Sequence, residues 1–161
     1  KIPKSPEFRE QKIGTSFTNL QEVEAIEYLC QQFEQTWVSQ VDRGQPRKEV
    51  GIITFYGSQL RLIEQKINPA RFPSLHIRTG TVDRFQGMEK QIIIVSMVRN
   101  NDRGDIGFAK SPERVNVAFS RAQELLVIVG CHSLFTQSPI YSNVSDVVRL
   151  NGDLIDVSAL I

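Results

Sequence analysis

Two short polar segments, about thirty residues apart, hold the side chains best suited to bind phosphate. They are Thr81–Glu89, with the sequence TVDRFQGME, and Arg114–Ala122, with the sequence RVNVAFSRA. Each is expected where a βα unit turns at the carboxyl end of an apolar strand, which is where open α/β sheets bind ligands. Because the sequence contains no G-x-x-x-x-G-K-S/T loop, the two segments predict only half of a nucleotide site.

The two arginines of the second segment are candidate phosphate ligands. Arg114 and Arg121 are seven positions apart in a helix predicted over residues 112–124, which places them about 20° apart around the helix axis. Each guanidinium group can donate two aligned hydrogen bonds to a phosphate. The alternative is an ordinary solvated helix in which these arginines pair with the nearby Glu113 and Glu124.

The first segment offers a glycine and several polar side chains. Gly87 allows a ligand to approach the backbone closely, and Glu89 can accept hydrogen bonds from a ribose or from water. Thr81, Asp83 and Gln86 are further candidate partners. The alternative is a glycine turn between two strands, surrounded by ordinary polar residues.

Thr54 and Tyr56 follow an apolar strand predicted at residues 50–54 and are candidates for contact with nucleic acid. The Thr54 hydroxyl could bind a phosphate backbone, and the Tyr56 ring could stack on a base. The alternative is a strand-end threonine beside a half-buried tyrosine.

Strands and helices alternate along the sequence and must position these residues. Asn19, with Glu22 three positions later, predicts a capping box followed by a core-facing helix. The run of β-branched residues within 91–98 predicts a strand buried on both faces. With further strands expected at 75–79 and 125–130, the order predicts a RecA-like α/β fold: a doubly wound, mainly parallel sheet with helices on both faces.

The length and charge of the chain limit its organisation. Its 161 residues suit one domain, with residues 1–12 expected to be a linker or chain edge and residues 13–161 the domain itself. Lys and Arg number 19 against 18 Asp and Glu, so the overall charge does not favour a general binder of nucleic acid or membrane surfaces. Any such contact must be local.

The two cysteines and the hydropathy predict an intracellular environment. Cys30 and Cys131 are isolated beside apolar runs, which indicates buried thiols in a reducing compartment, without a disulfide or a zinc site. No stretch approaches 18 continuous apolar residues. We therefore expect a cytoplasmic protein, or a nuclear one in a eukaryote, without a membrane partner.

Five motifs together resemble, in order and spacing, the second RecA-like domain of superfamily 1B helicases, the C-terminal helicase domain of AAA type. The resemblance covers roughly residues 13–137 and is nearest to the nonsense-decay and senataxin-like group. The motifs are Val50–Tyr56, Thr81–Glu89, Val98-Arg99, Gly107-Phe108 and Arg114–Ala122.

The resemblance implies a specific role for each candidate residue. In this family ATP and Mg²⁺ lie between two RecA-like domains, and the first domain, which would be absent here, supplies the phosphate loop and the acidic magnesium-binding pair. Arg121 would then be the arginine finger, with Arg114 as an auxiliary or structural arginine. Gln86, Gly87 and Glu89 would line the nucleotide. Thr54, Tyr56 and Thr81 would face single-stranded RNA or DNA.

The implied protein is the C-terminal motor domain of an ATP-dependent helicase or translocase, a hydrolase that is inactive without the first RecA-like domain of its parent chain. Some family features differ: Glu113 replaces an arginine, Ser120 replaces a common threonine, and the family's Q-Y-R-M motif is missing. A non-catalytic α/β interaction module derived from a helicase is the alternative, and a free-standing nucleotide-binding enzyme is a third interpretation. The sequence does not distinguish RNA from DNA.

Overall fold

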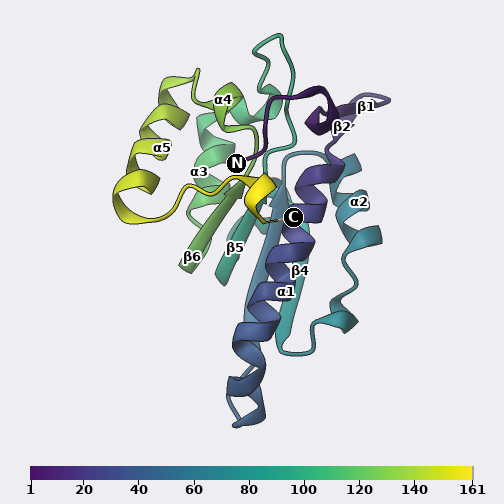
Figure 1. The fold of residues 1–161 in the computed structure, drawn as a ribbon, viewed down its shortest axis with the longest axis vertical. Helices are drawn as coiled ribbons and strands as arrows, with labels where there is room; N and C mark the ends of the chain where they lie inside the picture. The colour runs from purple at the N-terminus through teal and green to yellow at the C-terminus, as the bar shows by residue number, and fades with distance from the viewer. Residues whose placement is uncertain (161) are drawn as a thin grey trace.

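A four-stranded parallel sheet, with the strand order β4-β3-β5-β6, organises the computed structural model, which describes residues 1–160 (Figure 1). A separate antiparallel hairpin forms at the carboxyl edge of this sheet. The main strands are β3 (Lys48–Thr54), β4 (Leu75–Thr81), β5 (Lys90–Ser96) and β6 (Ala122–Val129), and the hairpin strands are β1 (Gln11–Ile13) and β2 (Ser16–Thr18). The predicted mainly parallel α/β fold is confirmed.

Helices cover both faces of the sheet and enclose a separate apolar core on each face. The α-helices are α1 (Leu20–Asp42), α2 (Gly57–Lys66), α3 (Pro112–Phe119), α4 (His132–Phe135) and α5 (Pro139–Asn151), and the 3₁₀ turns are η1 (Pro6–Phe8), η2 (Pro69–Arg71), η3 (Val82–Phe85), η4 (Gly107–Lys110) and η5 (Val157–Ala159). In β3, Ile52 packs in the core beneath α1, whereas Ile53 packs in the core that contains Phe85 and residues of α3. Within residues 1–160, no helix is both long and apolar enough to span a membrane.

The connection from β4 to β5 contains only the short turn η3 instead of a long helix. Phe85, at the end of η3, is fully buried against the sheet. A Cβ atom placed on Gly80 would lie 2.8 Å from the Phe85 ring, so the glycine makes room for the phenylalanine. This compact crossover returns the chain directly to the amino end of β5.

Residues 1–12, which the sequence predicts to be a linker or chain edge, contact the domain. Ile2 is buried and its N–H donates to the Gly130 carbonyl at 2.8 Å, while the Glu10 N–H donates to the Asn100 carbonyl at 3.2 Å. Strand β1 continues across the expected boundary at residue 13. The boundary itself stays a prediction.

The amino terminus of α1 holds the end of β5 through a buried polar network. Asn19 caps the helix as predicted, since its side chain accepts a hydrogen bond from the Glu22 N–H at 3.3 Å. The Glu22 carboxyl group does not complete a capping box: its oxygens accept hydrogen bonds from the Val98 N–H at 2.9 and 3.0 Å and from the Ser96 hydroxyl at 2.6 Å. The Asn19 Nδ2 also donates to the Val98 carbonyl, at 3.2 Å.

This network supports an unfavourable backbone conformation at Val98. Val98 has a φ of 70°, which is rare for a β-branched residue. It is the middle residue of a tight turn, in which the Arg99 N–H donates to the Met97 carbonyl at 2.8 Å. Strand β5, predicted to extend to residue 98, therefore ends at Ser96, and the turn directs Arg99 towards the β1–β2 hairpin.

Burial of Glu22 predicts an unusual dependence of stability on pH. Burial raises the pKa of Glu22 to about 8, although the hydrogen bonds from Ser96 and Val98 oppose this shift. Between the ordinary glutamate pKa and pH 8, the folded state retains a proton that the unfolded state has released. Glu22 therefore contributes most to the free energy of unfolding below about pH 4.5, and this contribution falls by up to about 1.4 kcal/mol per pH unit as the pH rises to 8.

The variant Glu22→Gln tests this prediction, because the amide cannot titrate. Urea denaturation at pH 5, 6.5 and 8 should show a steeper loss of stability with rising pH in the wild-type chain than in the variant. Comparing slopes removes the contribution of other titrating groups, such as His132, whose pKa is lowered by burial. Equal slopes for the two proteins would contradict the assignment.

Candidate functional site

Parts of the two predicted phosphate segments meet at the amino ends of β5 and β6. The Lys90 N–H donates to the Arg121 carbonyl at 3.0 Å, and the Gln123 side chain donates to the Glu89 carboxylate at 3.4 Å. The prediction that both segments lie at the carboxyl ends of strands is wrong for these residues. The η3 crossover and α3 both carry the chain back across the sheet before the next parallel strand begins.

Arg121 lies in the turn between α3 and β6. Its Nη2 donates to the Ser120 hydroxyl at 2.9 Å. Its Nε is buried and has no hydrogen-bond partner in the described part of the chain. Since a buried donor without a partner is costly, the described part of the chain leaves the hydrogen-bonding capacity of this guanidinium group incompletely satisfied.

The turn beside Arg121 is open to solvent. Gln86, Gly87 and Glu89 are all exposed. Gly87 has a φ of 79°, and a Cβ atom placed on it would meet no atom of the described residues within 4 Å. The backbone here can approach a ligand, as the sequence predicts, but whether these residues bind one stays a prediction.

Arg114 lies at the other end of α3 from Arg121, so the predicted common helical face is wrong. The helix ends at Phe119 instead of continuing to residue 124, because Ala122 already pairs with Lys90 in the sheet. The Arg114 guanidinium lies over the Phe108 ring, 4.9 Å from its centroid, and 3.8 Å from the Asp83 carboxylate. These contacts belong to the carboxyl edge of the sheet.

Thr54, Tyr56 and Thr81 lie at that carboxyl edge, but two of them are enclosed. Thr54 is fully buried and Tyr56 is 3% exposed, whereas Thr81 is half-buried. The Tyr56 ring packs between Phe17 and Phe108, with centroid distances of 5.7 and 5.1 Å. In this conformation, therefore, Tyr56 has no free face on which a base could stack. Its burial does not support the predicted contact with nucleic acid.

Arg99 organises this edge, and sequence reasoning assigned it no role. Its guanidinium group is 2% exposed and forms ion pairs with Glu10 and Asp105, each at 2.9 Å. It also lies 4.1 Å from the centroid of the Phe17 ring and donates to the Tyr56 hydroxyl at 3.4 Å. Burial alone would lower the pKa of Arg99, but these partners raise it above its usual value, so the group stays charged.

Gly107 allows the loop after β5 to close over Arg99. Its φ is 55°, and a Cβ atom placed on it would lie 2.0 Å from the Tyr56 hydroxyl and 2.3 Å from Arg99 Nη1. The Gly107 N–H donates to Asp105 at 3.0 Å, and this hydrogen bond, together with Arg99, holds the pKa of Asp105 below its usual range. One sequence signal pointed to the cluster around Arg99: the pairs Val98-Arg99 and Gly107-Phe108 are among the five motifs that resemble the helicase domain.

Comparisons with known proteins identify the family. A family model described as an AAA domain matches residues 1–133. The chain belongs to this AAA domain family. This match and the relatives described next together confirm the resemblance to the C-terminal helicase domain of superfamily 1B.

Three relatives illustrate the range of this family. The chain is 38% identical over 112 residues to the helicase required for RNAi-mediated heterochromatin assembly 1 of Schizosaccharomyces pombe, covering 69% of the chain and 11% of the relative. It is 35% identical over 136 residues to the regulator of nonsense transcripts 1 of Dictyostelium discoideum, covering 81% and 10%. It is 40% identical over 97 residues to the DNA replication ATP-dependent helicase/nuclease DNA2 of Saccharomyces cerevisiae, covering 60% and 6%. The chain thus spans between 6% and 11% of the length of these relatives.

The close contacts of Gly107 predict that Gly107→Ala destabilises the AAA domain. Gly104→Ala is a matched control, because Gly104 also has a positive φ, of 69°, but a Cβ atom there would lie 3.4 Å from the nearest atom, in the flexible Gln137 side chain. Both substitutions place an alanine on a backbone with positive φ, which is strained, but only Gly107→Ala also displaces Tyr56 and Arg99. We expect Gly107→Ala to lower the free energy of unfolding by about 2 kcal/mol more than the control.

Urea denaturation of the two variants measures this difference. If Gly107→Ala were no more destabilising than Gly104→Ala, the close contacts of Gly107 with Tyr56 and Arg99 would not contribute to stability as predicted.

Proposed function

We propose that this chain is the C-terminal motor domain of an ATP-dependent nucleic-acid helicase or translocase, with Arg121 as its arginine finger. The observation that carries the proposal is the buried Nε of Arg121, which has no partner within residues 1–160. The backbone of Arg121 is bound to Lys90, just after the exposed glycine turn at the amino edge of the sheet, and the relatives of the chain include named helicases.

The residues at this edge fit the phosphate end of a nucleotide held mainly by another domain. ATP with Mg²⁺ supplies the phosphoryl group and its charge neutralisation when bound. Arg121 would donate to the transferring phosphate, while Gln86, Gly87 and Glu89 would line the nucleotide. The first RecA-like domain of the same parent chain would supply the phosphate loop and the magnesium ligands, so this domain alone is inactive.

Arg114 fits a structural role better than a nucleotide-binding one. Its guanidinium packs on Phe108 and lies near Asp83, at the opposite end of α3 from Arg121. A helix of eight residues separates its two ends by about 12 Å. Arg114 therefore contributes to the carboxyl edge, where single-stranded RNA or DNA would bind.

The position of Glu113 weakens the alternative of a non-catalytic interaction module. Two sequence features favoured the alternative: the missing half of the nucleotide site, and Glu113, which replaces a family arginine. In the structure Glu113 lies in the first turn of α3 and accepts a hydrogen bond from the Ser111 hydroxyl at 2.9 Å. Because this turn is at the far end of the helix from Arg121, Glu113 does not oppose the positive charge of the proposed finger.

In the parent protein, Arg121→Ala should abolish ATP hydrolysis, whereas binding of single-stranded RNA or DNA should persist. An arginine finger contributes about 10³ to 10⁵ in rate, and the variant should lose turnover on that scale. Arg121→Lys keeps the charge but loses the planar fork, so it should also be strongly impaired. Arg43→Ala, which alters an exposed arginine after α1, is the matched control and should hydrolyse ATP normally.

The measurement is steady-state ATPase activity with and without single-stranded RNA or DNA, alongside strand binding by fluorescence anisotropy. The 161-residue chain alone should show no hydrolysis. Near-normal turnover by Arg121→Ala would exclude the finger assignment. A wild-type parent protein that hydrolyses no ATP with either nucleic acid would favour the interaction module.

A further inference from the structure

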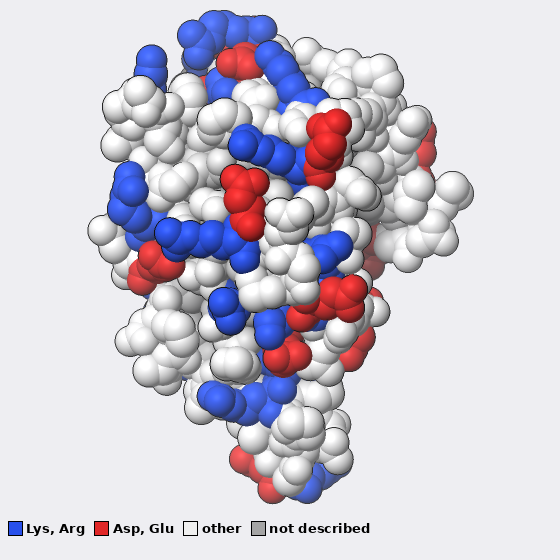
Figure 2. Space-filling view, turned by 180° about the vertical axis from the view of Figure 1, so that it is seen from behind, with Lys and Arg blue, Asp and Glu red and all other residues white. Residues whose placement is uncertain are grey.

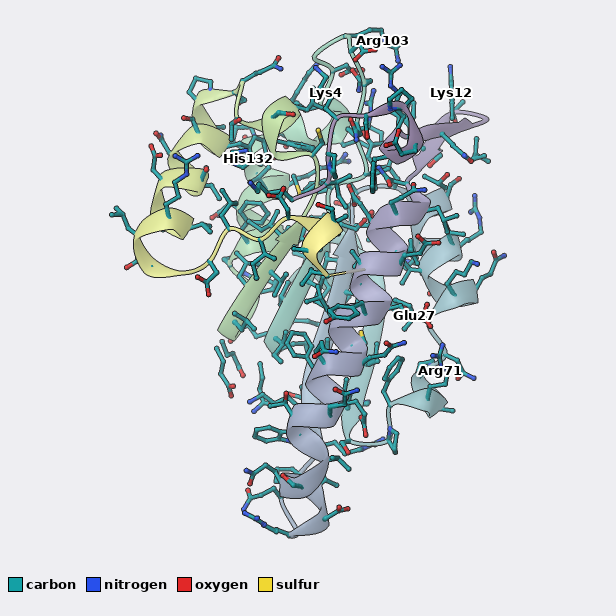
Figure 3. The ribbon with its side chains drawn as sticks, in the orientation of Figure 1. Lys4, Lys12, Glu27, Arg71, Arg103 and His132 are labelled. Atoms are coloured by element: carbon teal, nitrogen blue, oxygen red, sulfur yellow. The ribbon has the colours of Figure 1, made fainter. Side chains whose placement is uncertain are left out.

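An open pocket of about 310 Å³ lies between the β1–β2 hairpin and the loop that follows β5. Arg9, Lys12 and Phe17 line it from the hairpin side, and Asn100, Asp102 and Arg103 line it from the loop side. Figure 3 places Lys12 and Arg103, together with Lys4, along the upper edge of the molecule, where the parallel strands end. The pocket therefore belongs to the carboxyl edge of the sheet and is separate from Arg121.

The pocket has an excess of unneutralised positive charge. Of its two acidic side chains, Glu10 is bound by Arg99 and Asp102 is bound by Arg9. Among residues 1–160, no acidic side chain forms a salt bridge with Lys12 or Arg103. Seen from behind, a group of Lys and Arg side chains lies at the top of the molecule, with an acidic side chain among them (Figure 2). Two exposed cations thus flank the pocket without an internal partner.

A row of aromatic rings leads away from the pocket along the same edge. Phe17 forms part of the pocket wall, Tyr56 packs against it, and Phe108 packs against Tyr56. Phe108 is 50% exposed, which makes it the exposed member of the row. Tyr56 and Arg114 both contact its ring, at 5.1 and 4.9 Å from the centroid, so the surface that Phe108 can offer to a ligand is the exposed half of its side chain, whereas Tyr56 has almost none. Cations together with an exposed aromatic ring are the features with which proteins hold single strands without reading their sequence.

We propose that this pocket binds the phosphate backbone of single-stranded nucleic acid through Lys12 and Arg103, and that Phe108 supplies the surface on which a neighbouring base stacks. This inference rests on the proposed function, because it assigns the strand-binding residues of the same motor domain. In this proposal Phe108 takes the place of the buried Tyr56 as the residue on which a base stacks. A free nucleotide fits less well, because the pocket is open and continues into an aromatic row along which a single strand of nucleic acid can lie.

The double variant Lys12→Ala/Arg103→Ala in the parent protein tests the backbone contacts. Both side chains are exposed, so their removal should leave the fold intact. Each phosphate contact to a single strand contributes about 0.7 to the slope of log affinity against log salt. Loss of two contacts should lower this slope by about 1.4 and weaken binding roughly 20-fold in 0.1 M salt.

The measurement is fluorescence anisotropy with labelled oligo-dT and oligo-rU between 50 and 200 mM salt. The control is Arg43→Ala/Arg47→Ala, which removes two exposed cations from the turn between α1 and β3 and should change neither affinity nor slope. Phe108→Ala should weaken binding about tenfold through lost stacking but leave the salt slope unchanged. This difference in slope separates the phosphate contacts from the stacking contact.

The outcomes separate the site from the proposed function. If the wild-type parent hydrolyses ATP and binds strands, but Lys12→Ala/Arg103→Ala keeps the wild-type affinity and slope, the pocket assignment is overturned while the motor assignment stands. If the wild-type parent neither hydrolyses ATP nor binds either strand, the proposed function fails and the site fails with it. An equal loss in the control and in the double variant would indicate a general charge effect and would also overturn the site.

Discussion

The ion pairs of the buried Arg99 side chain, with the buried Glu10 and the partly exposed Asp105, hold the carboxyl edge of this domain together. One guanidinium group joins Glu10 of the amino-terminal segment, Asp105 of the loop after β5, the Tyr56 hydroxyl and the Phe17 ring. Removing the charge from water is costly, so such a group is stable only when nearly every donor finds an acceptor. Loss of Arg99 would leave the buried Glu10 carboxylate without its cation. The arrangement of the edge therefore depends on this one side chain more than on any single apolar contact.

The orientation of the Arg99 side chain depends on the tight turn centred on Val98. A β-branched residue with positive φ is strained, and the surrounding structure must compensate for it. Glu22 and Asn19 do so from the start of α1, by binding the N–H and the carbonyl of Val98 respectively. Gln59 extends the network by donating to the Ser96 hydroxyl at 3.0 Å. Helix α1, helix α2 and strand β5 are thereby fixed together at the point where the chain turns towards the hairpin.

Local sequence patterns predict the fold well but do not predict which edge of the sheet each candidate residue occupies. The unbroken β-branched run of β5 and the Asn19 cap are local signals, and both are confirmed. The end of α3 is decided by the pairing of Ala122 with Lys90, thirty-two positions away, which no helical pattern contains. The burial of Tyr56 likewise depends on Phe17, Arg99 and Phe108, which are distant in sequence. A side chain can be assigned to a site from its type, but its exposure is set by such long-range contacts.

The separation of the two edges limits how they can communicate. The proposed finger, Arg121, lies at the amino edge, and the aromatic row and the basic pocket lie at the carboxyl edge. The elements with contacts at both edges include β5, which binds the Arg121 carbonyl through Lys90 and is held by Glu22 just beyond its other end. They also include the η3 crossover, with Asp83 near Arg114 and Glu89 bound by Gln123, and α3, which runs from Arg114 to the turn before Arg121. The core of β5 is fully buried on both faces and cannot bend without disturbing two hydrophobic clusters. Helix α3 has fewer buried residues, Val115 and Ala118, so a shift of α3 would disturb less of the core than a shift of β5.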